Sequence, residues 1–186
     1  QTSLLDYWGT VIFLNYKIAE QKIKGIITKN KSTTILQDIV DVLYESFEKY
    51  SWVGIYLVEG DVLVLGPWKG KQATEHIKIP IGKGVCGSAA QSGKTEIVDE
   101  VSKDSRYLSC FLSTRSEIVV PIKKKNTVIG EIDIESDIHA AFDNNDAVFL
   151  EKIADMLRQH IWEIDFFSVL KIFIIARMAQ KRFVHH

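Results

Sequence analysis

Several features that would mark a specialised class of protein are scarce in this sequence of 186 residues. Two cysteines are too few for a secreted scaffold built on disulfides, so we expect a reducing cytoplasm, where any disulfide would be transient and functional. A formal charge of −1 gives no electrostatic reason to bind nucleic acid or an anionic membrane. The apolar runs at 7–16 and 166–176 are shorter than the roughly 20 residues that cross a bilayer, so no stable membrane insertion is expected.

The remaining composition is that of one globular domain with additional segments at its ends. Hydrophobic residues make up 46% of the chain and charged residues 25%, which is enough for a sizeable core. We place the domain at 33–164, between an N-terminal extension at 1–32 and an apolar and basic tail at 165–186. The extension could hold a docked helix or strand at 7–16, or a poorly ordered or membrane-touching arm, followed by a connector or fraying helix. The tail could be an interfacial helix or an oligomer contact, which leaves a homodimer open.

Hydrophobic periodicity divides the domain into helices and strands. Apolar residues at helical spacing predict helices at 33–50 and 142–164. Alternation with period two predicts strands at 52–58, 62–65, 76–81, 95–98, 115–122 and 126–135. Glycines and Pro67 predict a loop at 66–70, and small residues after Gly82 predict a short helix. This order predicts an α+β fold with a mostly antiparallel central sheet, helices packed on one face and a ligand pocket on the other.

Both cysteines lie in the stretch 82–135, which carries the candidate chemistry. Cys86 precedes the predicted short helix, whose N-terminus would favour the thiolate; alternatively, it is a small buried residue that fills space. Cys110 falls in a loop at 100–114, where it is either functional or an inert thiol. The two could form a disulfide if the fold brings their Cα atoms within roughly 7 Å.

Acidic residues on two neighbouring strands form the second candidate feature. Glu131, Asp133 and Glu135 alternate with isoleucines and therefore share one face, and Glu117 lies on the strand before them. This face could be solvated, which is the usual environment of acidic residues. If it instead lines a pocket, crowding and burial would raise some carboxyl pKa values and leave a proton donor near neutral pH. The histidines show no metal-binding spacing, and no metal is expected.

The order of five motifs resembles the free methionine-(R)-sulfoxide reductases, which are single GAF-domain enzymes. The motifs are WVGIYL at 52–57, LGP at 65–67, IGKGVCG at 81–87, SEIVVP at 116–121 and GEIDIES at 130–136. The resemblance implies a redox disulfide between Cys86 and Cys110, in which Cys110 attacks the sulfoxide sulfur and Cys86 resolves the sulfenic acid. It implies that Glu117, Asp133 and Glu135 bind the substrate ammonium group and supply the proton. Trp52 and Tyr56, which share a strand face, would hold the methyl group.

The same resemblance implies a thioredoxin-like dithiol as external reductant and no bound cofactor. Three features depart from the family pattern: no cysteine lies about ten residues before the GVCG motif, Glu135 stands where Asp is frequent, and both ends lie outside the match. The alternative is a GAF sensor that binds a small molecule without catalysis, since fold alone does not fix function. Trp68 could be a lid over the pocket or an aromatic packed under the predicted loop at 66–70.

Overall fold

The computed structural model describes residues 4–29, 34–108 and 111–161 of the chain. A six-stranded sheet in the order β3-β2-β1-β6-β5-β4 forms its centre, and all neighbouring strands are antiparallel. The strands are β1 (Trp52–Glu59), β2 (Val62–Gly70), β3 (Lys78–Pro80), β4 (Glu96–Val98), β5 (Ser116–Lys124) and β6 (Thr127–Ser136). The helices are α1 (Leu4–Lys29), α2 (Ile35–Ser46), α3 (Gly84–Ser92) and α4 (Asn144–Ile161), with a 3-10 turn at Val101–Lys103. The predicted α+β architecture is confirmed.

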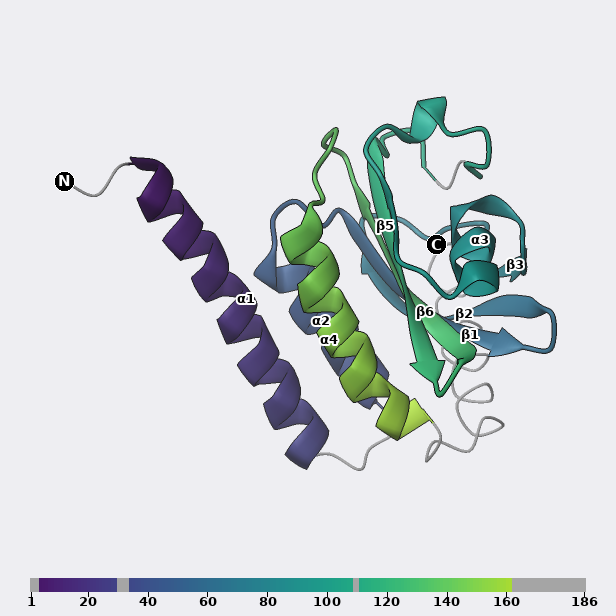
Figure 1. Cartoon of the computed structure of the whole chain (residues 1–186), viewed down its shortest axis with the longest axis horizontal. Helices are drawn as coiled ribbons and strands as arrows, with labels where there is room; N and C mark the ends of the chain where they lie inside the picture. Colours follow the sequence, from purple (N-terminus) through teal and green to yellow (C-terminus); the bar gives the residue numbers. More distant parts are fainter. Residues whose placement is uncertain (1–3, 30–33, 109–110, 162–186) are drawn as a thin grey trace, which may run out of the picture.

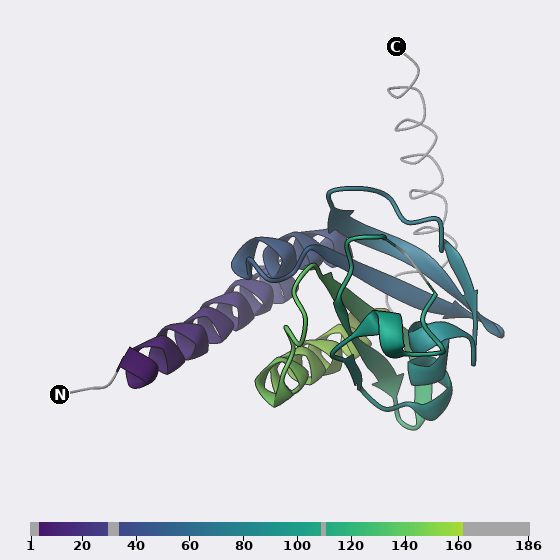
Figure 2. The same cartoon turned by 90° about the horizontal axis from the view of Figure 1, so that it is seen from above.

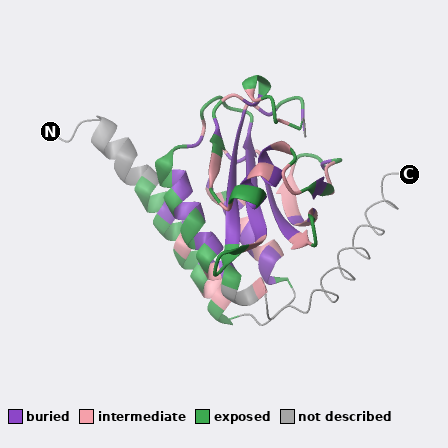
Figure 3. Ribbon diagram, turned by 45° about the vertical axis from the view of Figure 1, so that its right-hand side comes forward, coloured by how far each residue is buried: buried purple, intermediate pink, exposed green. Residues whose placement is uncertain are grey.

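The alternation of side chains along each strand gives the sheet two different faces. The first carries Val53, Ile55, Ile118, Ile132 and Ile134, which form the larger core with residues of α2 and α4, and α1 packs on those two helices. The second face lies under α3 and the segment after β4, as Figure 1 shows. The central strands are buried on both sides (Figure 3). A residue on the second face is therefore enclosed although it points away from the main core.

The N-terminal segment is one continuous helix, which excludes a connector or a strand at 4–29. Tyr16, Ala19 and Ile23 recur at helical spacing and are at most 9% exposed, so α1 contributes to the main core. Its N-terminal part projects beyond the sheet, as Figure 2 shows. Phe13, Leu14 and Ile18 lie on the other side of the helix and are exposed. Among the described residues, no helix is both long and apolar enough to cross a membrane.

The loop predicted at 66–70 is wrong, because β2 continues to Gly70. The pairing shifts between Gly54, which faces Trp68, and Tyr56, which faces Leu65. Two residues of β2, Gly66 and Pro67, therefore stand opposite Ile55 in a β-bulge. A bulge accommodates a proline that cannot donate to the ladder, and the strand resumes after it. This resumption brings Trp68 back beside β1.

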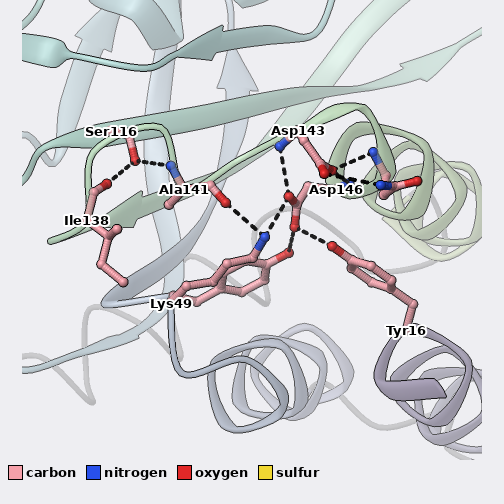
Figure 4. A network of polar contacts seen from close by, with 9 residues as sticks. Tyr16, Lys49, Ser116, Ile138, Ala141, Asp143 and Asp146 are labelled. Atoms are coloured by element: carbon pink, nitrogen blue, oxygen red, sulfur yellow. Dashed lines mark hydrogen bonds and ion pairs between the residues drawn. The ribbon is translucent and has the colours of Figure 1, made fainter. Parts of the chain in front are cut away.

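A buried network around Asp146 joins α1, the segment between α2 and β1, and the start of α4 (Figure 4). Tyr16 and Tyr50 donate hydroxyl hydrogen bonds to Asp146 Oδ1 at 2.8 and 3.0 Å, and Lys49 Nζ lies 2.7 Å from Oδ2. Asp143 Oδ1 accepts the amide of Asp146 at 3.3 Å, and Asp146 Oδ2 accepts the amide of Asp143 at 2.9 Å. This reciprocal arrangement is a capping box, in which Asp143 is the cap that begins α4. Phe47 turns to extended backbone, so α2 ends earlier than the predicted residue 50.

Candidate active site

The strand register places the predicted acidic residues beside one another on the second face of the sheet. Glu135 in β6 pairs with Trp52 on one side and with Glu117 of β5 on the other. Asp133 follows two residues earlier in β6, opposite Gly54. Glu117 is 3% exposed, Asp133 is 1% exposed and Glu135 is fully buried. Of the two alternatives for this face, the solvated outer face is therefore excluded, and the carboxyls lie inside the protein.

Glu131 continues the same row and is also fully buried. It was recognised in the sequence as sharing the face of Asp133, but it was not among the residues expected to form the site. Its partners across the strands are Tyr56 and Pro121. Strict alternation along β6 was the signal that could have included it, since residues i and i+2 share one environment.

Helix α3 brings Cys86 onto this acidic group. The helix begins at Gly84, earlier than predicted, so Cys86 lies within its first turn and not before it. A Cβ on Gly87 would lie 2.5 Å from the carbonyl oxygen of Pro80, and only glycine allows this close approach. The Cys86 thiol donates to Glu117 Oε1 at a sulfur–oxygen distance of 3.6 Å. Cys86 is buried and its sulfur faces the carboxyls.

Burial dominates the electrostatics of these carboxyls. Loss of hydration raises the pKa of Glu117 well above its usual value, and the nearby charges of Asp133 and Glu135 raise it further. Burial likewise raises the pKa of Asp133, with the charge of Glu135 adding to the effect. The pKa of Glu131 is raised by burial and then by Asp133, while the Cys86 thiol partly offsets the effect. The group therefore holds protons at a pH where exposed carboxyls have lost them.

Several carboxyl oxygens of the site accept no hydrogen bond from the described part of the chain. No donor there forms a hydrogen bond with Glu117 Oε2, Asp133 Oδ1 or either carboxyl oxygen of Glu131. Glu135 differs, because its Oε2 accepts from the Thr114 hydroxyl. Buried polar atoms are normally satisfied, so a concentration of such oxygens indicates a place for a cationic or donor-rich ligand.

Aromatic residues form the apolar side of the site. The Trp52 ring stacks on Trp68 at a centroid distance of 6.2 Å and an interplanar angle of 14°, and contacts Phe111 at 6.0 Å. Trp68 therefore packs on Trp52 from within β2, and the loop under which it was predicted to pack does not form. A Cβ on Gly54 or Gly70 would lie 2.2 or 2.3 Å from Trp52, so the indole lies over backbone that carries no side chain. Tyr56 donates its hydroxyl to the His76 carbonyl at 2.8 Å.

Cys110 lies outside the described residues, as does Ser109. Its proximity to the carboxyls, and its pairing with Cys86, therefore stay predictions. On either side of the gap the chain lies at the site: the Leu108 side chain is 2.9 Å from the position of a Cβ on Gly84, and Phe111 contacts Trp52.

A cavity of about 350 Å³ lies elsewhere, at the end of α2 and the start of β1. Tyr44, Lys49, Lys71 and Asp137 are among the residues that line it. None of the predicted site residues does. It does not correspond to the expected ligand pocket.

Comparison with known proteins agrees with this arrangement. A family model described as GAF domain matches residues 32–161. The free methionine-R-sulfoxide reductase of Escherichia coli is 35% identical over 125 residues, which cover 67% of this chain and 74% of that protein. A structure of the Neisseria meningitidis free methionine-R-sulfoxide reductase in complex with its substrate superposes with a TM-score of 0.73 at 35% identity, covering 78% and 87% of the two chains. A protein of Burkholderia vietnamiensis described as a GAF sensor gives 0.73 at 32% identity, covering 82% and 96%.

The fold and the family match together define a GAF-domain protein. The buried thiol and carboxyl group on the second face is a feature that a purely structural module would not require. Within the GAF proteins, the chain belongs to the free methionine-R-sulfoxide reductase family.

Proposed function

We propose that this protein reduces free methionine-(R)-sulfoxide to methionine with the thiols of Cys110 and Cys86. The observation that carries the proposal is the buried cluster of Cys86, Glu117 and Asp133. Membership of a family whose relatives are named for this activity supports the same substrate.

The chemistry requires a nucleophile for sulfur and an acid for oxygen. The Cys110 thiolate attacks the sulfoxide sulfur, and the oxygen is transferred to it, so that methionine leaves and Cys110 becomes a sulfenic acid. The Cys86 thiol then attacks the Cys110 sulfur, which releases water and forms the Cys86–Cys110 disulfide. An external dithiol such as thioredoxin reduces this disulfide and restores both thiols. No bound cofactor takes part.

The carboxyls have two roles in this proposal. Glu117, Asp133 and Glu135 hold the substrate ammonium group, which their negative charge and the unused oxygens of Glu117 and Asp133 suit. One of them, kept protonated by burial, supplies the proton to the oxygen that leaves sulfur. Trp52 and Tyr56 form the apolar surface against the sulfoxide methyl group. An enclosed ammonium site favours the free amino acid over a residue within a peptide.

The test is a single-turnover reaction of the reduced protein with methionine-(R)-sulfoxide, followed by intact mass and peptide mapping. The parent protein should lose two hydrogens and yield a linked Cys86–Cys110 peptide. Cys110→Ser should release no methionine, whereas Cys86→Ser should release one per chain and stop at the sulfenic acid. Asp61→Asn, in the exposed β1–β2 turn, is the control and should behave as the parent. Turnover retained by Cys110→Ser and lost by Cys86→Ser would reverse the two roles.

The alternative is a GAF module that binds a small molecule and transmits a signal. The similarity to a protein described as a sensor favours it. Binding of methionine sulfoxide without any mass change or methionine release, in the parent protein and in both cysteine variants, would select this function.

A further inference from the structure

The donor atoms around Cys86 also suit a divalent metal ion. Cys86 Sγ and one carboxyl oxygen each from Glu117 and Asp133 lie within 4.8 Å of one another. They come from α3, β5 and β6, so packing of the helix on the sheet fixes their separation. All three residues are at most 5% exposed.

The spacing agrees with tetrahedral zinc. Typical zinc–sulfur and zinc–oxygen bonds at the tetrahedral angle separate the sulfur and oxygen by about 3.6 Å. Cys86 Sγ and Glu117 Oε1 are 3.6 Å apart. An ion can therefore bind between these two atoms with little movement of either side chain, and a thiolate among the ligands favours zinc over magnesium or calcium.

Glu131 provides a second observation that points to a cation here. It is fully buried, both of its carboxyl oxygens have no hydrogen-bond partner in the described part of the chain, and it lies two residues before Asp133 on the same face of β6. Among described residues, no lysine, arginine or histidine forms an ion pair with Glu117, Glu131 or Asp133. Glu131 can therefore add negative potential, or accept a hydrogen bond from a metal-bound water.

We propose that the reduced protein binds Zn²⁺ through Cys86 Sγ, Glu117 and Asp133. The ion displaces the thiol proton and the protons that burial keeps on the Glu117 and Asp133 carboxyls, all of which pass to solvent, and no group is oxidised or reduced. From the sequence we expected no metal, because the histidines lack metal-binding spacing. The sequence could not show that α3 packs against β5 and β6, which brings these ligands together. Bound zinc would occupy the thiol and carboxyls that are proposed to act on the sulfoxide, so we expect zinc to inhibit sulfoxide reduction. This expected inhibition rests on the proposed function, whereas the proposed zinc binding does not.

Cobalt(II) is the spectroscopic probe, added to the full chain under argon with a phosphine reductant. We expect a thiolate-to-cobalt charge-transfer band that one equivalent of Zn²⁺ removes. Cys86→Ser should lose the charge-transfer band, whereas Cys110→Ser should retain a charge-transfer band. Asp133→Asn should weaken zinc binding at least tenfold, and the control Asp61→Asn should not change it. The His185–His186 pair can bind cobalt but produces no thiolate band.

Circular dichroism of each variant verifies folding. Absence of the band in the parent protein, a band that survives Cys86→Ser, or equal zinc affinity in the folded Asp133→Asn and Asp61→Asn variants would overturn the site. A band with the expected dependence on Cys86, in protein that reduces no sulfoxide, would support the metal site and reject the proposed function. A band, together with single-turnover sulfoxide reduction that zinc blocks, supports both the metal site and the proposed function.

Discussion

At the scale of single residues, the buried carboxyl of Glu131 lowers the stability of the fold, because its neighbours do not fully compensate for the hydration that it loses. Its carboxyl is buried without a hydrogen-bond donor among the described residues, and burial raises its pKa above the usual 4.5. The folded protein therefore keeps a proton that the unfolded chain releases once the pH exceeds about 4.5. The free energy of unfolding falls as the pH rises through this range, because the unfolded state binds fewer protons.

Replacement of Glu131 by Gln should therefore stabilise the fold at pH 8, by about 1 kcal/mol, because no charge remains to be desolvated. The gain should diminish toward pH 4, where the carboxyl is protonated in both states. Urea unfolding at several pH values, with a chelator present, measures this gain in the free energy of unfolding. Glu75→Gln, at an exposed position before β3, is the control, and a gain that is independent of pH would contradict this explanation.

Gly54 is the residue on which the position of Trp52 depends. A methyl group there would meet the indole at 2.2 Å, and the ring cannot move away because Trp68 and Phe111 enclose it. Gly54→Ala should therefore lower stability by about 1–3 kcal/mol and shift the tryptophan fluorescence. Gly25→Ala in α1, where nothing lies within 4 Å, is the matched control and should be neutral or slightly stabilising. Equal changes in stability for Gly54→Ala and Gly25→Ala would show that contact with Trp52 does not determine the effect at position 54.

At the scale of elements, α1 is attached to the domain by a polar contact as well as by apolar packing. Tyr16 donates to Asp146, and its ring packs on Phe47 and Phe149 at centroid distances of 5.1 and 5.0 Å. Tyr16→Phe retains the ring and removes one donor from a buried carboxyl. We expect a loss of about 1–2 kcal/mol in the free energy of unfolding. Leu14→Ala on the exposed side of α1 should change it by less than about 0.5 kcal/mol, and equal losses would exclude a specific role for the hydroxyl.

The elements also show what could be predicted from the sequence. Alternation along β6 was sufficient to place Asp133 and Glu135 on one face of their strand, and alternation along β1 placed Trp52 and Tyr56 on one face of theirs, because strand periodicity is local. Only the register between β1 and β6 shows that the two pairs share one face of the sheet. The end of β2 was not predictable, since Gly66 and Pro67 usually end a strand and only the pairing with Ile55 makes them a bulge. The contact of Cys86 with Glu117 depends on tertiary packing between residues 31 positions apart, which neither local pattern contains.

At the scale of the whole molecule, the tail after Ile164 lies outside the described residues, and its role stays a prediction. The segment at 166–176 is apolar apart from Lys171, and α1 exposes Phe13, Leu14 and Ile18. Truncation after Ile164 should lower solubility or change the oligomeric state while the site chemistry remains. Light scattering coupled to size-exclusion chromatography, with single-turnover mass analysis in parallel, tests both parts. Unchanged molar mass and unchanged stability would contradict the prediction.

The contact between Tyr16 and Asp146 has a consequence for biosynthesis. The two residues are 130 positions apart, so α1 leaves the ribosome long before its acceptor has been translated. At ordinary elongation rates of roughly 5–20 residues per second, the apolar side of α1 waits on the order of ten seconds for the sheet and α4. A nascent chain arrested before residue 146 should therefore expose Ile23 to chaperones and proteases, and release from the ribosome should protect it.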